Sequence, residues 1–233
     1  MHIGLIGGIG VAATIVYYQR LTAAVAERGT TLDLTISHGD IQTLIQNNLA
    51  DARQPQAERF AVQIDRLKAA GCDCVALTSL GAHFCVNEMA TLSALPVVSG
   101  VAPLDGYFAR EGIKRIGLLG TRGVMASRLY GQLAQTEAVA VDSEIDHIGQ
   151  AYLDMAVAGH CTPSQREVFV AAGRQMVEDQ GADAIVLAGT DLNLAFDGLD
   201  PGYKVIDALD VHVSVLADLA CDRLSLDEVA IKT

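Results

Sequence analysis

Apolar positions in this chain form two kinds of pattern. Short unbroken apolar runs, bounded by glycine or polar residues, predict buried strands at residues 2–7, 32–37, 74–78, 96–98, 116–119, 184–188 and 203–206. Apolar residues spaced three and four apart predict amphipathic helices at residues 14–27, 56–70, 163–180 and 211–224, with further helices from about 81 and about 126.

The alternation of strands with helices indicates the α/β class, with parallel sheets built from right-handed strand–helix–strand units. Ligands of such folds bind outside the carboxyl ends of the strands. The loops expected at those ends are residues 7–14, 37–45, 78–84, 120–127 and 189–193. Candidate chemistry is therefore sought in these loops.

The same building plan occurs twice along the chain. The segment Ile3-Gly-Leu-Ile-Gly-Gly returns 113 residues later as Ile116-Gly-Leu-Leu-Gly-Thr. The segment Gly71-Cys-Asp-Cys-Val-Ala-Leu-Thr-Ser returns 110 residues later as Gly181-Ala-Asp-Ala-Ile-Val-Leu-Ala-Gly. These nearly equal offsets predict two similar Rossmann-like or flavodoxin-like domains, related by a pseudo-twofold axis and separated by a ligand cleft. We expect residues 1–98 plus 207–233 in the first domain and residues 99–206 in the second.

Composition narrows the classes of partner. The 233 residues carry a formal net charge of −12, which disfavours non-specific binding to nucleic acid or to anionic membranes. No apolar run reaches the roughly 18 residues of a membrane span, and the first residues lack a signal-peptide pattern. The five cysteines are an odd number, which favours a reduced, cytoplasmic setting over a disulfide framework.

A glycine loop follows the first predicted strand. Gly8-Ile9-Gly10-Val-Ala-Ala13 has the form G-x-G-x-x-A between a strand and a helix, and Asp33 follows at a suitable distance for a ribose contact. The equivalent loop of the second copy, Gly120-Thr-Arg-Gly123, breaks this pattern. A tight turn that leaves room for a small anionic ligand explains the loop equally well, and we predict no nicotinamide or flavin cofactor.

Two repeated loops face each other in the expected cleft. Thr78-Ser-Leu-Gly-Ala-His83 and Ala188-Gly-Thr-Asp191 follow equivalent strands, so pseudo-symmetry places Ser79 and Gly189 on opposite walls. This arrangement is typical of two-base chemistry, in which one group removes a proton from a carbon and another delivers a proton to the opposite face.

Over essentially its whole length the chain resembles the aspartate/glutamate racemase superfamily. The resemblance rests on four blocks in order: the glycine-rich start 7–14 with Tyr17-Tyr18, the block 79–83, the stretch from Gly120-Thr121 through Met125, Ser127 and Tyr130, and the block 188–191. It implies two α/β domains and proton transfer by two cysteines without cofactor or metal. It also implies substrate contacts from Gly8, Ile9, Gly81, Ala82, Thr121 and Thr190.

The departures from that family concern the catalytic positions. The two cysteines of the family fall on Ser79 and Gly189, and the Asn-Thr pair that holds a substrate carboxylate falls on Leu80-Gly81. The arginine of the loop after the second strand is missing from Ser37-His-Gly-Asp-Ile41, and a family lysine falls on Val157. We therefore expect little or no racemization of aspartate or glutamate. We also expect that cysteines returned to positions 79 and 189 would bring back α-proton exchange.

His83 and Asp191 remain as candidate acid–base groups in the cleft loops. A histidine with a pKa near about 6.5 can act as either acid or base, but His83 can equally be a helix-start residue bonded to backbone. Asp191 can equally be a helix N-cap, and His38 and Asp40 can simply shape a turn. His160 and Cys161 have no companions at metal-ligand spacing, so no metal is predicted.

The sequence thus predicts a cofactor-independent protein of the racemase or isomerase class, acting on a small carboxylate such as an acidic amino acid. One alternative is a catalytically inactive racemase-like binding protein, and another is a decarboxylase or lyase that protonates one face only. We also expect a homodimer.

Overall fold

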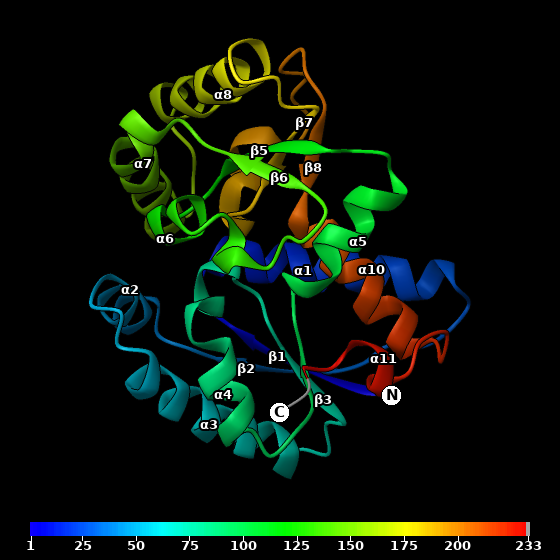
Figure 1. Cartoon of the computed structure of the whole chain (residues 1–233). Coiled ribbons are helices and arrows are strands. Elements are labelled where there is room, and N and C mark those ends of the chain that lie inside the picture. The colour runs from blue at the N-terminus through cyan, green and yellow to red at the C-terminus, as the bar shows by residue number, and fades with distance from the viewer. Residues whose placement is uncertain (232–233) are drawn as a thin grey trace.

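The computed structural model describes residues 1–231 and contains two four-stranded parallel sheets, one in each half of the chain. Figure 1 shows the first sheet in the lower half of the view and the second in the upper half, with helices α1 and α10 between them. The fold class expected from the repeat, two similar α/β domains, is confirmed.

The first sheet has the order β2-β1-β3-β4. Its strands are β1 (His2–Gly7), β2 (Asp33–His38), β3 (Cys74–Leu77) and β4 (Val97–Val98). The helices of this half are α1 (Val11–Glu27), α2 (Ile41–Leu49), α3 (Arg53–Ala69), the 3-10 helix η1 (Leu80–Cys85) and α4 (Val86–Leu92).

The second sheet has the equivalent order β6-β5-β7-β8. Its strands are β5 (Arg115–Leu119), β6 (Glu137–Val139), β7 (Ala184–Leu187) and β8 (Val205–Asp207). Its helices are α5 (Ala102–Arg110), α6 (Arg122–Ala126), α7 (Ile145–Ala158), α8 (Pro163–Glu178) and α9 (Asn193–Phe196), with 3-10 turns η2 (Leu129–Gly131), η3 (Asp142–Glu144) and η4 (Thr190–Leu192). The chain ends with α10 (Ala208–Ala220) and α11 (Leu226–Val229).

Each sheet has one point at which the chain reverses its direction of travel across the strands. In the first sheet this point lies between β1 and β3, and in the second between β5 and β7. Ligands of open α/β sheets bind at such switch points, outside the carboxyl ends of the strands. The loops that leave these four strands contain Gly8–Gly10, Ser79, Thr121 and Gly189–Asp191, so the topology brings most of the expected site residues to one region.

Helix α10 packs against both halves of the molecule. Leu209, Val213 and Leu216 belong to an apolar core with Ile3 and Leu5 of β1. Ala208 and Val211 belong instead to the core of the second sheet. The division at residues 98–99 and 206–207 stays a proposal. Strand β4 of the first sheet ends at Val98, and β8 of the second sheet ends at Asp207, one residue beyond the proposed return.

An ion-pair cluster also ties the two halves together. Arg20 of α1 contacts Asp207 and Asp210 at the start of α10 at 2.8 and 2.7 Å, and Asp197 after α9 at 2.8 Å. Burial, reinforced by the neighbouring charge of Asp210, raises the pKa of Asp207 to about 7. Arg20 is thus the cation that compensates a buried carboxylate at the domain boundary, a role that the sequence patterns did not reveal.

The structure differs from the sequence-based expectations in several elements. Helices α2, α5 and α7 and the short strand β6 were not predicted, and α6 begins at Arg122 rather than near Ala126. Helix α2 begins where the side chain of Asp40 accepts the backbone N–H groups of Gln42 and Thr43, so Asp40 is a helix cap rather than a residue that only shapes a turn. Thr121 similarly caps α6 by accepting the Val124 N–H.

Among residues 1–231, no helix is both long enough and apolar enough to serve as a membrane span.

Candidate active site

A small cavity lies between the two switch points. Its volume is about 40 Å³, which has room for only one or a few water molecules. From the first domain it is lined by Ile9, Ile41, Leu44, Ile45, Asn48, Ser79 and Gly81. From the second domain it is lined by Thr121, Tyr152, Leu153, Ala156 and Asp191. Residues of both halves of the chain therefore line one narrow cavity at the place where the sequence led us to expect a cleft.

Asp191 reaches across the cleft to helix α1. Its Oδ1 accepts the backbone N–H of Ala13 in the first turn of α1 at 3.0 Å, and its Oδ2 accepts the Tyr152 hydroxyl at 3.2 Å. A carboxylate at a helix N-terminus is stabilised by the unpaired N–H groups and the positive end of the helix dipole. Asp191 thus caps α1 of the opposite domain, and not η4, in whose first turn it lies.

Burial decides the protonation of Asp191. Removal from water raises the pKa, whereas the bonds from Ala13 and Tyr152 favour the charged form; the balance is a pKa of about 6. A carboxyl group with this pKa can both accept and release a proton near neutral pH, as general acid–base catalysis requires.

The space beside Gly189 is filled by Tyr152 of α7. A Cβ atom at position 189 would overlap the tyrosine ring, with Cζ at 2.7 Å and Cδ2 at 2.9 Å. The Tyr152 ring, rather than Gly189, lines the cavity. A cysteine at position 189 therefore cannot enter this wall unless Tyr152 moves, so the expectation that two cysteines would bring back α-proton exchange stays a prediction that requires this ring to move.

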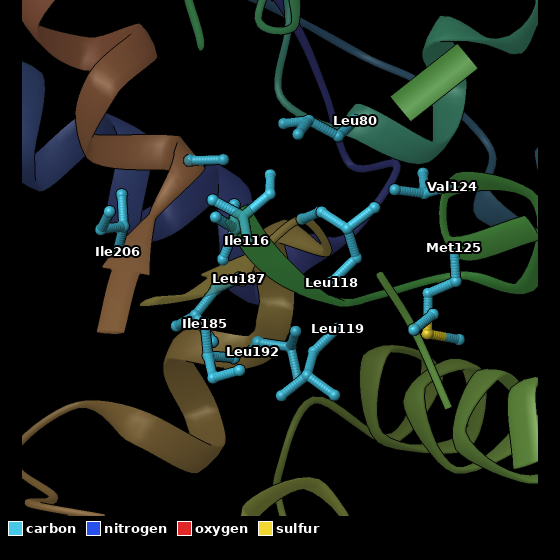
Figure 2. Packing of buried hydrophobic residues seen from close by; sticks show 14 of the residues in the cluster. Leu80, Ile116, Leu118, Leu119, Val124, Met125, Ile185, Leu187, Leu192 and Ile206 are labelled. Atoms are coloured by element: carbon cyan, nitrogen blue, oxygen red, sulfur yellow. The ribbon is translucent and has the colours of Figure 1, made fainter. Parts of the chain in front are cut away.

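Ser79 stands on the first-domain wall. Its side chain is almost fully buried and faces the cavity, and no hydrogen-bond partner for its Oγ is found among residues 1–231. The neighbouring residue Leu80, at the position of the family asparagine, turns away into the apolar core of the second domain. Figure 2 shows Leu80 in one cluster with Ile116 and Leu118 of β5. The Ser79 wall thus offers a hydroxyl group without an adjacent base.

His83 is held entirely by backbone groups. Its Nδ1 lies 3.0 Å from the Ser79 carbonyl oxygen, and its Nε2 accepts the Gly100 N–H at 2.9 Å. These bonds require the neutral ring with its proton on Nδ1, and burial lowers its pKa to about 4. His83 does not line the cavity, and its contacts with Ser79 and Gly100 match the backbone-bonded alternative that the sequence left open.

The remaining sequence candidates divide into two groups. Ile9, Gly81 and Thr121 line the cavity with Ser79 and Asp191, whereas Gly8, Ala82 and Thr190 do not. The Thr190 hydroxyl donates instead to the Thr78 carbonyl oxygen at 2.9 Å and so joins the two switch points. Gly8 adopts a positive φ of 77°, and a side chain there would overlap the His38 ring, so its need for glycine is conformational.

Tyr152 and the cleft face of α2 are the main omissions of the sequence analysis. Both lie on helices that the patterns did not predict. One available signal was the spacing of Ile41, Leu44, Ile45 and Asn48 at i, i+3, i+4 and i+7, which places them on one helical face. No sequence motif marks Tyr152.

No group of three or more His, Cys, Asp or Glu side chains within residues 1–231 is arranged to hold a metal ion.

Comparisons with known proteins agree with this architecture. The family described as Asp/Glu/Hydantoin racemase matches residues 6–216, so the chain belongs to that family. Membership supports a racemase or isomerase kind of function for the protein.

Three solved structures illustrate the shared fold. A candidate Asp/Glu racemase from Yersinia pestis is 24% identical with a TM-score of 0.79, and the match covers 95% of this chain and 100% of that one. An aspartate racemase homologue from Pyrococcus horikoshii OT3 is 21% identical with a TM-score of 0.74, covering 94% and 99%. The aspartate racemase of Picrophilus torridus is 17% identical with a TM-score of 0.73, covering 97% of each chain. At these identities the likeness shows the fold.

Proposed function

We propose that this protein catalyses proton transfer at the carbon next to the carboxyl group of a small acid, without a cofactor, in the interdomain cleft. The observation that carries the proposal is the Tyr152–Asp191 pair. The pair lies on the wall where the family has its second cysteine, and burial gives Asp191 a pKa of about 6.

The proposed step uses Asp191 as the base. The carboxylate takes the α proton, the electron pair of the C–H bond moves toward the substrate carboxyl group, and the protonated Asp191 then returns a proton to the same face. The Tyr152 hydroxyl donates to Asp191 Oδ2 and so favours the charged form of the base.

The residues on the two walls of the cleft favour proton transfer at one face of the α carbon over proton transfer at both faces. Ser79 carries a hydroxyl without a base beside it, and both nitrogens of the nearby His83 are engaged by backbone groups. A serine hydroxyl alone is a poor substitute for a positioned acid or base, whose loss costs roughly 10²–10⁴-fold in rate. Exchange of the α proton in one enantiomer should therefore be much faster than conversion into the other.

Deuterium incorporation tests this proposal. Each enantiomer of aspartate, glutamate, alanine and leucine is incubated with the protein in deuterated water, and deuterium at the α carbon and inversion are followed separately. We expect exchange of at least one acid, mainly in one enantiomer, and a loss of roughly 10²-fold or more in the Asp191→Asn variant. The matched control is Asp65→Asn, an exposed residue of α3 outside the cavity lining. Absence of exchange with every acid contradicts the proposal.

A catalytically inactive binding protein is the second candidate. It is supported by Ser79 and Gly189, which provide no thiol at the positions of the two family cysteines. Saturable binding of an acid without any α-proton exchange is the result that favours this candidate.

The proposals on assembly and location rest on separate features. Helix α1 carries three large apolar side chains that are about half exposed, Val11, Ile15 and Tyr18, on one stripe, and this stripe supports a homodimer. Sedimentation equilibrium of wild type and Ile15→Glu tests it, because the charged variant should be a monomer. The free thiols of Cys72, Cys74 and Cys85 are buried in the core, which supports a reducing cytoplasmic setting.

A further inference from the structure

The lining of the cleft suggests which acid the protein accepts. Helix α2 of the first domain presents Ile41, Leu44 and Ile45 to the cavity, and α7 of the second presents Leu153 and Ala156. Two walls that come from different domains are thus both apolar. An apolar substituent between them would be removed from water, which is favourable, whereas a charged one would lose its hydration.

The charged groups around the cavity also favour an uncharged substituent on the ligand. Asp191 is the one charged side chain among the lining residues, and it is acidic. No lysine or arginine within residues 1–231 lines this cavity. Arg59 and Arg66 line a different cavity, of about 260 Å³, that shares only Ile9 with the cleft. Arg122, at the start of α6, is paired with Asp146 and largely exposed.

A second carboxylate on a ligand would therefore have no cation to balance it. It would stand near the acidic Asp191 within a protein whose net charge is −12, and both effects oppose a dianion. Neutral donors are sufficient for a single carboxylate. Within residues 1–231 the Ser79 hydroxyl has no hydrogen-bond partner, and the Thr121 oxygen accepts the Val124 N–H but donates to no group, so both hydroxyl protons can be donated to a ligand.

From this lining we infer that the cleft takes an acid with one carboxylate and an apolar substituent, and that Ile41, Leu44 and Ile45 of α2 select against a second carboxylate. This inference rests on the proposed function, because it assumes that the same cleft binds the substrate. Since the cavity is small, α2 and α7 must separate when the ligand enters and close on its substituent afterwards.

Leucine and aspartate form a matched pair for the test, because their side chains have nearly the same shape and differ in charge. Binding of each enantiomer to the whole chain is measured by isothermal titration calorimetry at neutral pH. We expect one enantiomer of leucine to bind at least about 10-fold more tightly than either enantiomer of aspartate. Equal or tighter binding of aspartate, or no binding of leucine at millimolar concentration, overturns the inference.

A cation placed on the α2 face gives a second readout. Ile45→Arg should shift the preference toward aspartate by about 10-fold or more, because it supplies the missing partner for the second carboxylate. Leu49→Arg is the matched control, since Leu49 is an exposed residue of the same helix outside the lining, and it should leave the preference unchanged. An equal shift in both variants contradicts the assignment to α2.

The two proposals fail in different ways. If leucine binds with the expected preference but exchanges no α proton, the proposed function fails and the ligand class stands. If aspartate binds and exchanges its α proton while leucine does neither, the ligand class fails and the proposed function stands.

Discussion

Gly189 and Tyr152 share one space at the centre of the cleft. The tyrosine ring lies where a side chain of residue 189 would project, and its hydroxyl donates to Asp191. Glycine at position 189 and tyrosine at position 152 are therefore parts of one packing arrangement, because the ring fills the space that the glycine leaves. Glycine at position 189 leaves room for the Tyr152 ring, whereas any larger residue at that position would require the ring to move.

A double-mutant cycle measures that packing. Gly189→Cys should destabilise the fold by roughly 1–3 kcal/mol, because the new side chain overlaps a buried ring. In Gly189→Cys/Tyr152→Ala the free energy of unfolding should fall by less than the sum of the two single changes, by a coupling of about 1 kcal/mol or more. Urea unfolding of the four proteins gives the values.

The control for this cycle is Gly106→Cys in α5, where a Cβ atom meets nothing closer than 3.5 Å. That variant should show neither the large destabilisation nor the coupling to Tyr152. Additive effects of Gly189→Cys and Tyr152→Ala contradict the shared-space interpretation.

Asp191 should also leave a signature in stability. Its folded-state pKa of about 6 lies above its ordinary value of 3.8, so its favourable contribution is complete below about pH 4 and is lost as the pH rises through 6. The loss amounts to at most about 3 kcal/mol. Relative to wild type, Asp191→Asn should gain stability between pH 4 and pH 7, as measured by urea unfolding across that range. A constant difference between the two proteins would show that Asp191 titrates normally in the folded state.

At the scale of elements, two side-chain clusters hold the passage of the chain between the domains, one partly exposed and one buried. Arg20 of α1 holds three aspartates around the start of α10. His83 accepts the Gly100 N–H, and the ring of His212 packs against Gly100. The segment around Gly100, where the chain crosses to the second domain, is thus held by His83 and His212. Helix α10, which follows the return of the chain, is held by Arg20 of α1.

Removal of Arg20 should be costly. Asp207 is a largely buried carboxylate that also caps α10 through the Leu209 N–H, and without its cation it remains uncompensated. Arg20→Met should lower the free energy of unfolding by about 2 kcal/mol, a value reduced from that of fully buried pairs because Arg20 is partly solvated. The exposed pair Arg53–Asp51 provides the control, and Arg53→Met should change stability by less than about 1 kcal/mol. Similar losses in both variants would argue against the proposed coupling.

His83 should give a pH dependence opposite to that of Asp191. Its folded-state pKa of about 4 lies below its ordinary value of 6.5, so its contribution is present above pH 6.5 and is lost as the pH falls to about 4. His83→Gln should be less stable than wild type by about 1–3 kcal/mol at pH 7, through lost buried hydrogen bonds. The difference should shrink toward pH 4. The comparison with exposed His160→Gln is made by urea unfolding at several pH values, and a gap that stays constant would contradict the role of His83.

At the scale of the whole molecule, the sequence was sufficient for the architecture because the internal repeat is long and its apolar runs are regular. The strands at Ile3 and Ile116, and the glycine turns that follow them, can each be recognised from a short stretch of sequence. The switch points then follow from the order of the strands in each sheet. The site was only partly predictable. Ser79, Thr121 and Asp191 lie in loops directly after strands, where topology alone brings them together.

Tyr152 and the α2 face could not be found in the same way. The spacing of Ile41, Leu44 and Ile45 could have indicated an apolar helical face, but the contact of α2 and α7 across the cleft is a tertiary contact that local sequence does not indicate. For His83 the sequence left two interpretations open, and the contacts of both ring nitrogens with backbone groups depend on packing that spacing does not reveal. Spacing along the chain identifies which loops meet, but the partners of each side chain depend on packing.

The most direct test of the account is the pH dependence of α-deuterium incorporation by wild type and by Tyr152→Phe, using the acid that exchanges fastest. If Asp191 is the base, the rate for wild type should rise with pH through a midpoint near 6. Loss of the Tyr152 hydroxyl removes a bond that favours the charged carboxylate, so the midpoint of Tyr152→Phe should move to higher pH. The exposed Tyr18→Phe variant should keep the wild-type midpoint. A profile that is identical in wild type and Tyr152→Phe, or that has no midpoint near pH 6, would contradict the assignment of Asp191 and Tyr152.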